Sequence, residues 1–362
     1  TTTEATSEAA SAASTSGSKT DVAFVTDVGN IDDQSFNQYT WQGVQDFCSA
    51  NNLSANYYRP TEDSDAARLE QMDNAVNDGA KSIVVAGYLF GSAIAEAQEK
   101  YPDVQFLALD VSTADLGDKT PTANTALITY KEEQAGYLAG YAAVYDGYKE
   151  LGFLGGMAVP AVIRYGYGFV QGVDAAAAAK GVEGVEVNYI YGGQFNGDGD
   201  ITAVMDTWYS NGTQLVFACG GGIFTSAAEA AQKVNGKVIG VDTDQSAVID
   251  GGYGEGMTVT SAMKGLAPTT IDTLTDVIVN GNWANYAGKI ETLGLVSADD
   301  PSANYVQLPL ETTQWADGKF TVEDYTALVA DMFNGKVKVS NDTTVEPTVS
   351  NIAVNYLGNI KG

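Results

Sequence analysis

Three carboxylates and one aromatic ring lie close together near the start of the chain, at Asp27, Asp32, Asp33 and Phe36. They follow the apolar run Val22–Val25, which predicts a buried strand. In an open parallel sheet, ligands bind outside the carboxyl ends of the strands, where this loop would lie. Ionised carboxylates accept hydrogen bonds from ligand N–H and O–H groups, and they repel phosphate. The loop therefore predicts a site for an uncharged polyhydroxy or amide-bearing ligand with a flat face.

The same residues have a simpler structural interpretation. Gly29-Asn30 breaks the regular structure after the strand, and a helix is expected to follow. Asp32, Asp33 and Ser35 are acceptors suited to its first turn. In that interpretation the carboxylates cap the helix, and Phe36 belongs to the core.

Several kinds of chemistry are disfavoured. The chain has no histidine, the commonest general base and metal ligand. The stretch 196–200 resembles the start of a calcium-binding EF-hand loop, but Ile201 and Thr207 stand where that loop needs glycine and glutamate. Gly220–Gly222 precedes a predicted helix without the lysine of a phosphate-binding loop, so close approach to a neutral ligand is favoured. We therefore expect no metal, no cofactor and no catalytic residue.

The elements that must position these residues alternate between strand and helix. Repeated units of this kind form a mostly parallel sheet with helices on both faces. The pattern starts again at a helix expected over Glu132–Tyr148, so the fold class is α/β with two successive halves, each doubly wound. The predicted strands are Val22–Val25, Ala55–Tyr58, Ser82–Ala86, Val104–Leu109 and Ala126–Thr129, then Leu151–Leu154, Val185–Ile190, Leu215–Ala218 and Val238–Val241.

Acidic, aromatic or glycine residues come just after many of these strands. If the two halves face each other, the strand ends converge on one cleft, and an interface between two lobes is a favoured ligand site. Two lobes that close on a ligand form a known hinged architecture. The residues at the strand ends are Asp27, Gly87, Asp110, Gly155, Phe195, Gly220 and Asp242.

Composition limits the possible partners. The chain of 362 residues has 46 acidic and 18 basic residues, and its net charge of −28 argues against nucleic acid and anionic lipid as partners. No apolar run approaches the roughly 20 residues needed to span a bilayer. Cys48 and Cys219 are interpreted as two buried thiols, with a disulfide left as an alternative. Residues 1–19, rich in Ser, Thr and Ala, are expected to be a disordered tether.

An ordered series of motifs resembles the basic-membrane-protein (Bmp/PnrA-like) lipoproteins, which are substrate-binding proteins of ABC importers, several of them for purine nucleosides. The resemblance covers about residues 21–290, and after Val296 only the predicted helix and FNGKVKV within Phe320–Val339 are similar. The matching motifs are Asp27 with Ile31–Gln38 and Gly43 behind it, Gly87–Phe90 (GYLF), Phe106–Asp110 (FLALD), Glu133–Gly140 (EQAGYLAG), Gly155–Met157 with Val159-Pro160, Gly166–Gly172 (GYGFVQG), Tyr191–Asn196 (YGGQFN), Val216–Gly222 (VFACGGG), Gly240–Gln245 (GVDTDQ) and Thr260–Lys264 (TSAMK).

The resemblance implies a two-lobed type I periplasmic-binding-protein fold with a hinge. It implies an N-terminal lobe over 20–130 with a returning segment near 258–285. A C-terminal lobe would cover 131–257, with 286–362 packing mainly on it.

The resemblance also implies roles for individual residues. Phe36 and Phe195 would sandwich a base, Asp27 and Asp110 would meet its polar edge, and Asp242 with Lys264 would hold the ribose. The alternatives are that Phe195 packs under Tyr191 and that Lys264 is a surface lysine. The other expected ligand-binding residues are Asp33, Asn37, Gly87, Tyr88, Gly220 and Gly221.

The function implied is that of an extracytoplasmic, monomeric binding protein rather than an enzyme. It would be lipid-anchored through a segment missing from this sequence, and would deliver guanosine, inosine or adenosine to an ABC permease and its ATPase subunit. One alternative is a binding protein for a sugar or other small polar ligand. The other is a nucleoside-acting enzyme that uses Asp27 or Asp33 as a base.

Overall fold

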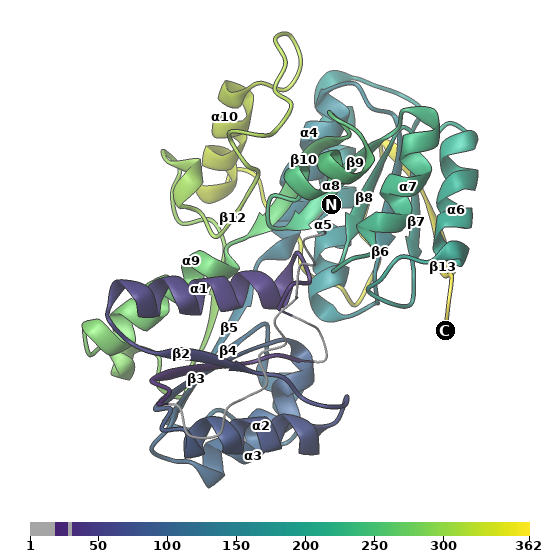
Figure 1. The fold of residues 1–362 in the computed structure, drawn as a ribbon. Coiled ribbons are helices and arrows are strands. Elements are labelled where there is room, and N and C mark those ends of the chain that lie inside the picture. Colours follow the sequence, from purple (N-terminus) through teal and green to yellow (C-terminus); the bar gives the residue numbers. More distant parts are fainter. Residues whose placement is uncertain (1–18, 28–30) are drawn as a thin grey trace, which may run out of the picture.

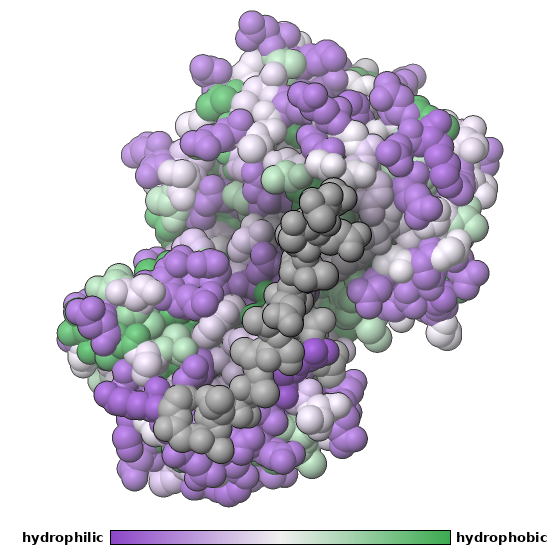
Figure 2. Space-filling model, viewed as in Figure 1, coloured by the Kyte–Doolittle hydropathy of each residue, from purple (hydrophilic) through white to green (hydrophobic). Residues whose placement is uncertain are grey.

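The computed structural model describes residues 19–27 and 31–362, which form two sheets in two lobes (Figure 1). Nearly all of the predicted tether, and the predicted break at Gly29-Asn30, lie outside the described residues. The predicted strands are all present, with ends that differ by at most one residue. Hydrophilic residues predominate on the face seen in Figure 2, among scattered apolar ones.

The first sheet has six parallel strands in the order β11-β5-β4-β3-β1-β2. Helices α1 and α9 cover one face of this sheet, and α2 and α3 cover the other (Figure 1). The strands are β1 (Val22–Val25), β2 (Ala55–Tyr58), β3 (Ser82–Ala86), β4 (Gln105–Leu109), β5 (Thr125–Tyr130) and β11 (Ile290–Leu293), and the helices are α1 (Phe36–Ala50), α2 (Asp65–Asn77), α3 (Gly91–Lys100) and α9 (Leu266–Leu274).

The second sheet has the order β12-β10-β9-β8-β6-β7-β13, and only the short β12 runs antiparallel to its neighbour. Helices α4 and α5 pack on one face, with α10 beyond them, and α6, α7 and α8 pack on the other. The strands are β6 (Glu150–Gly155), β7 (Val185–Tyr191), β8 (Leu215–Cys219), β9 (Lys237–Asp242), β10 (Thr258–Lys264), β12 (Val306–Gln307) and β13 (Ile352–Asn359), and the helices are α4 (Glu132–Tyr145), α5 (Pro160–Lys180), α6 (Gly199–Ser210), α7 (Phe224–Val234), α8 (Ser246–Tyr253) and α10 (Val322–Phe333).

Within residues 31–362 the chain passes between the two sheets three times. It leaves the first sheet after β5, returns after β10 to form α9 and β11, and leaves again before β12. The sheet pairings add detail to the predicted lobes. β10, at the start of the predicted returning segment near 258–285, lies in the second sheet, and β11, within the range 286–362 predicted to pack mainly on the second lobe, pairs with β5 of the first sheet. The apolar pattern of a strand does not reveal its pairing partner, which is distant in sequence.

Helices α4 and α5 approach each other closely through glycine. A side-chain carbon added at Gly168 would lie 1.8 Å from the carbonyl oxygen of Glu133, and one at Gly136 would lie 2.1 Å from that of Tyr165. Contacts this short are impossible for any residue with a Cβ atom, so glycine is required at both places. The close pairing sets the first turn of α4 beside the second turn of α5, where Glu132 meets Arg164.

Both cysteines are free and buried, as predicted. Tyr148 lies beyond the end of α4, which stops at Tyr145, because Gly147 takes a left-handed conformation (φ +104°) that ends the helix. Within the described residues, no helix is both long enough and apolar enough to cross a lipid bilayer.

Asp146, just after α4, should make the free energy of unfolding depend on pH. Its carboxylate accepts a hydrogen bond from the backbone N–H of Phe320 at 2.9 Å, and burial raises its pKa from 3.8 to about 6. A carboxyl group whose pKa is raised by folding favours the folded state below its unfolded pKa, and this contribution is lost as pH rises through about 6. We expect Asp146→Asn, which retains an acceptor, to exceed the parent in unfolding free energy at pH 7 by about 1–3 kcal/mol.

The advantage of Asp146→Asn should disappear below about pH 4, where both side chains are neutral. Urea unfolding at pH 4 and pH 7 measures this, with the exposed Asp118→Asn as the matched control. An equal difference at both pH values would contradict the assignment.

Candidate functional site

A cavity of about 510 Å³ lies between the two lobes, at the carboxyl ends of their strands. All the residues predicted to bind ligand line it, and they come from both lobes. These residues are Asp27, Asp33, Phe36, Asn37, Gly87, Tyr88, Asp110, Phe195, Gly220, Gly221, Asp242 and Lys264. Of the strand-end residues predicted to converge on a cleft, all but Gly155 line this cavity, and the ligand-binding roles of its residues remain predictions.

The loop after β1 both caps helix α1 and lines the cavity. Asp33 caps α1, because its carboxylate accepts the backbone N–H groups of Ser35, Asn37 and Gln38 at 2.9–3.0 Å. Asn37 donates its amide to Asp27 at 3.0 Å and to Asp33 at 3.2 Å. The amide oxygen of Asn37 is buried and has no hydrogen-bond partner among the described residues. Asp33 is therefore a helix cap, and it also orients Asn37 at the wall of the cavity.

Gly87, after β3, and Asp110, after β4, line the same wall of the cavity. Gly87 has φ +113°, and a side chain there would approach the ring of Phe36 to 3.4 Å, so this position suits glycine. Asp110 follows β4 in a left-handed conformation (φ 56°) that is uncommon for any residue other than glycine. One carboxylate oxygen of Asp110 is bonded to Lys264, and the other, also buried, has no partner among the described residues.

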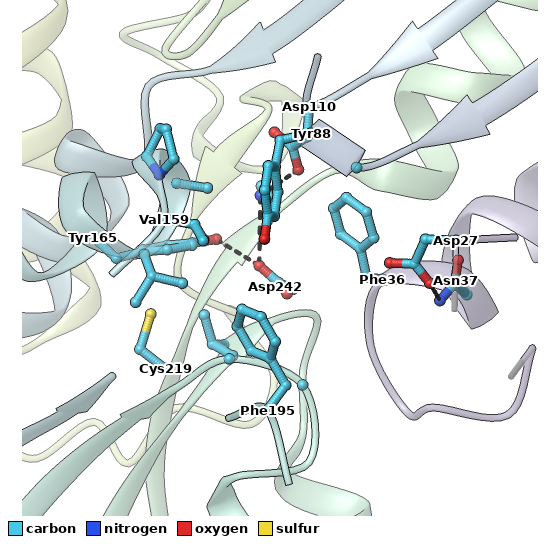
Figure 3. Close-up of a pocket in the computed structure, with 18 of the residues that line it drawn as sticks. Asp27, Phe36, Asn37, Tyr88, Asp110, Val159, Tyr165, Phe195, Cys219 and Asp242 are labelled. Atoms are coloured by element: carbon cyan, nitrogen blue, oxygen red, sulfur yellow. Dashed lines mark hydrogen bonds and ion pairs between the residues drawn. The ribbon is translucent and has the colours of Figure 1, made fainter. Parts of the chain in front are cut away.

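Phe195, in the loop between β7 and α6, rests on a surface made of glycine. A side-chain carbon at Gly156 would lie 2.4 Å from its ring, and one at Gly220 would lie 2.9 Å from it. The amide of Gly222 donates to the carbonyl of Phe195 at 2.8 Å. Figure 3 shows the rings of Phe36, Tyr88 and Phe195 directed into the same cavity. The glycines thus allow the Phe195 ring to lie flat against the ends of β6 and β8.

A buried charged cluster lies at the centre of the site. The Nζ atom of Lys264 is 2.6 Å from Asp110 Oδ2 and 3.9 Å from Asp242 Oδ1. It also lies 5.4–5.7 Å from the ring centres of Phe36, Tyr130 and Tyr165, within range of cation–π attraction. Lys264 is only 4% exposed, so the alternative of a surface lysine is wrong.

The protonation of Lys264 follows from this cluster. Burial alone would lower the pKa of the ammonium group. The carboxylates of Asp110, Glu132 and Asp242 outweigh burial and raise the pKa of Lys264 above its ordinary value. Lys264 therefore carries its charge across the physiological pH range.

The two lobes are hydrogen-bonded to each other beside this cluster. Ser35 Oγ of the first lobe donates to Asp242 Oδ2 of the second at 2.8 Å, and Tyr165 donates to Asp242 Oδ1 at 3.0 Å. The amide group of Gln245 reaches the carbonyl of Gln34 at 3.4 Å. Asp242 thus accepts hydrogen bonds from both lobes, so its contacts depend on how the lobes are placed.

The sequence did not identify several residues of the cavity. Arg164 lines it and forms a two-pronged ion pair with the fully buried Glu132, with Nη2 2.9 Å from Oε1. Burial raises the pKa of Glu132, although Lys264 and Arg164 oppose this. Arg164 and Tyr165 directly precede the GYGFVQG motif, the one signal that could have indicated them. Asp32 and Gly222, which belong to the predicted carboxylate loop and glycine run, also line the cavity. The other lining residues, which were not predicted, are Ser112, Asp115, Thr129, Val159–Val162, Asn196, Cys219 and Val241.

The cavity therefore brings aromatic rings and hydrogen-bond acceptors of both lobes together. Both cations that line it, Lys264 and Arg164, are already paired with carboxylates. Among the described residues there is no group of His, Cys, Asp or Glu side chains arranged to hold a metal ion.

Comparison with known proteins shows which family the sequence matches. The family described as ABC transporter substrate-binding protein PnrA-like (Bmp) matches residues 20–298. The ABC transporter nucleoside-binding protein BmpA of Lactococcus lactis is 30% identical over 251 residues, which cover 65% of this chain and 68% of that protein. An uncharacterized lipoprotein of Pyrococcus abyssi is 26% identical over 78% of this chain and 68% of its own length.

Solved structures agree with this result at the level of the fold. An ABC-transporter solute-binding protein of Aeropyrum pernix superposes with a TM-score of 0.66 at 22% identity, covering 90% of this chain and 88% of that one. The predicted two-lobed α/β fold of the type I periplasmic-binding class is therefore confirmed.

Proposed function

This chain belongs to the Bmp family of PnrA-like ABC transporter substrate-binding proteins, and from that premise we propose that it captures a purine nucleoside between its lobes and delivers it to an ABC permease. The observation that carries the proposal is the pair of rings, Phe36 and Phe195, which reach one cavity from opposite lobes. A base stacked between two rings gains affinity from each face, whatever its substituents.

Selectivity for the base would come from acceptor atoms. The oxygen of Asn37 and one oxygen of Asp110 are buried without partners among the described residues, and Asp27 lies beside Asn37. A buried acceptor left unpaired costs about 1–3 kcal/mol, so a ligand with N–H or O–H donors at these points is favoured. Guanosine, inosine and adenosine all carry such donors.

The sugar of the nucleoside would meet Asp242 and Lys264. Asp242 can accept from ribose hydroxyls, and Lys264 can donate to them. In the structure Ser35 and Tyr165 already donate to Asp242, so a bound ribose would share or replace these bonds. The predicted site residues Asp33, Gly87, Gly220 and Gly221 act mainly by shaping and capping these walls.

Electrostatics favour a neutral ligand. Carboxylates outnumber cations around the cavity, because Asp27, Asp32, Asp33, Asp110, Asp115 and Asp242 line it against Lys264 and Arg164. A phosphate group would be repelled unless a free cation met it, and both cations are engaged in ion pairs. We therefore propose the nucleoside rather than the nucleotide as ligand.

The protein would work outside the cytoplasm, attached to the membrane. The relatives include proteins described as lipoproteins, which supports a place outside the cytoplasm on a lipid anchor. In that setting the protein would act as a monomer with a permease and its ATPase subunit, without cofactor and without catalysis.

Thermal unfolding with a panel of nucleosides, free bases and pentoses tests the proposal. A ligand that binds only the folded state at about 100 times its Kd stabilises it by about 2.7 kcal/mol. We expect guanosine, inosine or adenosine to raise Tm, with ribose and the nucleoside monophosphates ineffective. A Tm shift with a sugar but with no nucleoside would favour the sugar-binding alternative. Conversion of inosine or adenosine to product during incubation would favour the enzyme.

A further inference from the structure

Residues 352–361 lie outside the region that matches the family, which ends at 298, yet they extend the second sheet. β13 pairs in parallel with β7 along its length (Figure 1). The pairing continues past the strand, because Ile360 N donates to the carbonyl of Tyr191 at 2.8 Å and Lys361 N donates to that of Gly192 at 3.1 Å. This segment therefore reaches the start of the loop over 192–198, which carries Phe195.

The side chain of Lys361 is bound to the far end of the same loop. Its Nζ atom forms an ion pair with Asp198 and a second with Asp200 at 3.2 Å. Asp198 also accepts from Gln194 at 3.1 Å and caps α6 by accepting from Ile201 N at 3.0 Å. Lys361 thus holds the beginning and the end of the loop together, with its backbone at Gly192 and its ammonium group at Asp198.

The first residues of the loop are also hydrogen-bonded to the end of β6. Gly192 N and Gly193 N donate to the carbonyls of Gly155 and Gly156 at 2.7 and 2.8 Å. Gly193 has φ +87°, and a side-chain carbon there would lie 2.2 Å from the carbonyl oxygen of Lys361. The start of the loop therefore lies between the carboxyl end of β6 and the residues that follow β13, and it contacts both.

From this arrangement we propose that Lys361 is a positioning residue for ligand binding, which holds the 192–198 loop so that Phe195 stays in the cleft. The inference rests on the proposed function only for the identity of the ligand. Lys361 does not line the cavity, so it acts through the loop and not by contact with the ligand.

The charges of the segment support this role. Asp198 and Asp200 are near neighbours in a chain of net charge −28, and Lys361 is the cation that the structure places between them. The hydrogen bond from Lys361 lowers the pKa of Asp198, as expected of a pair that stabilises the ionised carboxylate. Without the lysine the two carboxylates would repel each other across the start of α6.

Binding measurements on matched variants test the proposal. By calorimetry, we expect Lys361→Ala to raise the Kd for the nucleoside that the parent protein binds by about threefold to tenfold. Lys361→Arg, which keeps the charge, should bind within about twofold of the parent. Lys233→Ala is the control, because Lys233 forms a 2.9 Å ion pair with Asp206 between α7 and α6. In a Phe195→Ala background, Lys361→Ala should have no further effect.

Hydrogen exchange of the ligand-free protein tests the same role without a ligand. Peptides that cover 192–198 should exchange faster in Lys361→Ala than in the parent or in Lys233→Ala. Unchanged exchange, or a Kd for Lys361→Ala equal to that of the parent, would overturn the inference. If the parent binds no nucleoside, the proposed function fails, while the exchange result still decides whether Lys361 holds the loop.

Discussion

Lys264→Met is expected to lower the free energy of unfolding by about 3–5 kcal/mol, the largest stability effect among the variants considered. Methionine fills much of the same volume but leaves the carboxylates of Asp110 and Asp242 without their cation. Lys264 is 4% exposed, and its Nζ atom lies 2.6 Å from Asp110. Removal of one partner from a buried ion pair leaves an uncompensated charge that is largely withdrawn from water.

Lys119→Met is the matched control for this prediction. Lys119 forms an ion pair of similar length with Glu99, at 2.7 Å, but the two side chains are 39% and 55% exposed. An exposed pair contributes about 0–1 kcal/mol, so urea unfolding should barely distinguish Lys119→Met from the parent. The double variant Lys264→Met with Asp110→Asn should recover part of the loss, because it removes the unpaired carboxylate. A loss below about 1 kcal/mol for Lys264→Met would show that the cluster is better hydrated than its burial indicates.

Phe195→Ala and Phe36→Ala should each weaken nucleoside binding by about fivefold to 150-fold, which corresponds to the 1–3 kcal/mol contributed by stacking a base on an aromatic ring. Both rings are only partly buried and face the cavity, so truncation removes ligand contact more than core packing. Phe195 rests against glycine and the cavity, and its removal should change Tm little. Calorimetric titration of each variant with the nucleoside that stabilises the parent protein measures the loss.

Phe333→Ala provides the control for both variants, since Phe333 ends α10, is 45% exposed and does not line the cavity. A ligand held mainly by its sugar would respond differently. In that case Phe195→Ala would bind within about twofold of the parent, and free bases would not compete. That result would reject the stacked base and keep the two-lobed receptor.

Local patterns in the sequence were enough to predict most of the strands and the residues at their ends. Most of the predicted strands are short apolar runs, and several are followed by a polar or glycine residue such as Asp27, Gly87 or Asp110. Parallel strands place such residues at one edge of the sheet whatever the distance between them in sequence. This is why residues from widely separated motifs could be predicted to share one cavity.

Contacts that depend on the relation between distant segments could not be predicted in this way. The bond between Ser35 and Asp242 joins residues from different lobes, and no local pattern encodes it. Arg164 reaches the cavity only because glycines let α5 lie close against α4. The membership of β10 and β11 in their sheets depends on pairing between strands far apart in the chain.

Because the chain returns to the first lobe, the order in which the two lobes can fold during translation is restricted. Helix α9 covers one face of the first sheet, and Gly43 of α1 packs so tightly on it that an added carbon would lie 2.9 Å from the carbonyl of Ala267. Strand β11 then completes the edge of the same sheet. On a ribosome, the first lobe therefore keeps an apolar face uncovered until the elements from α4 to β10 of the second lobe have been made. The chain cannot complete its first lobe before it begins the second.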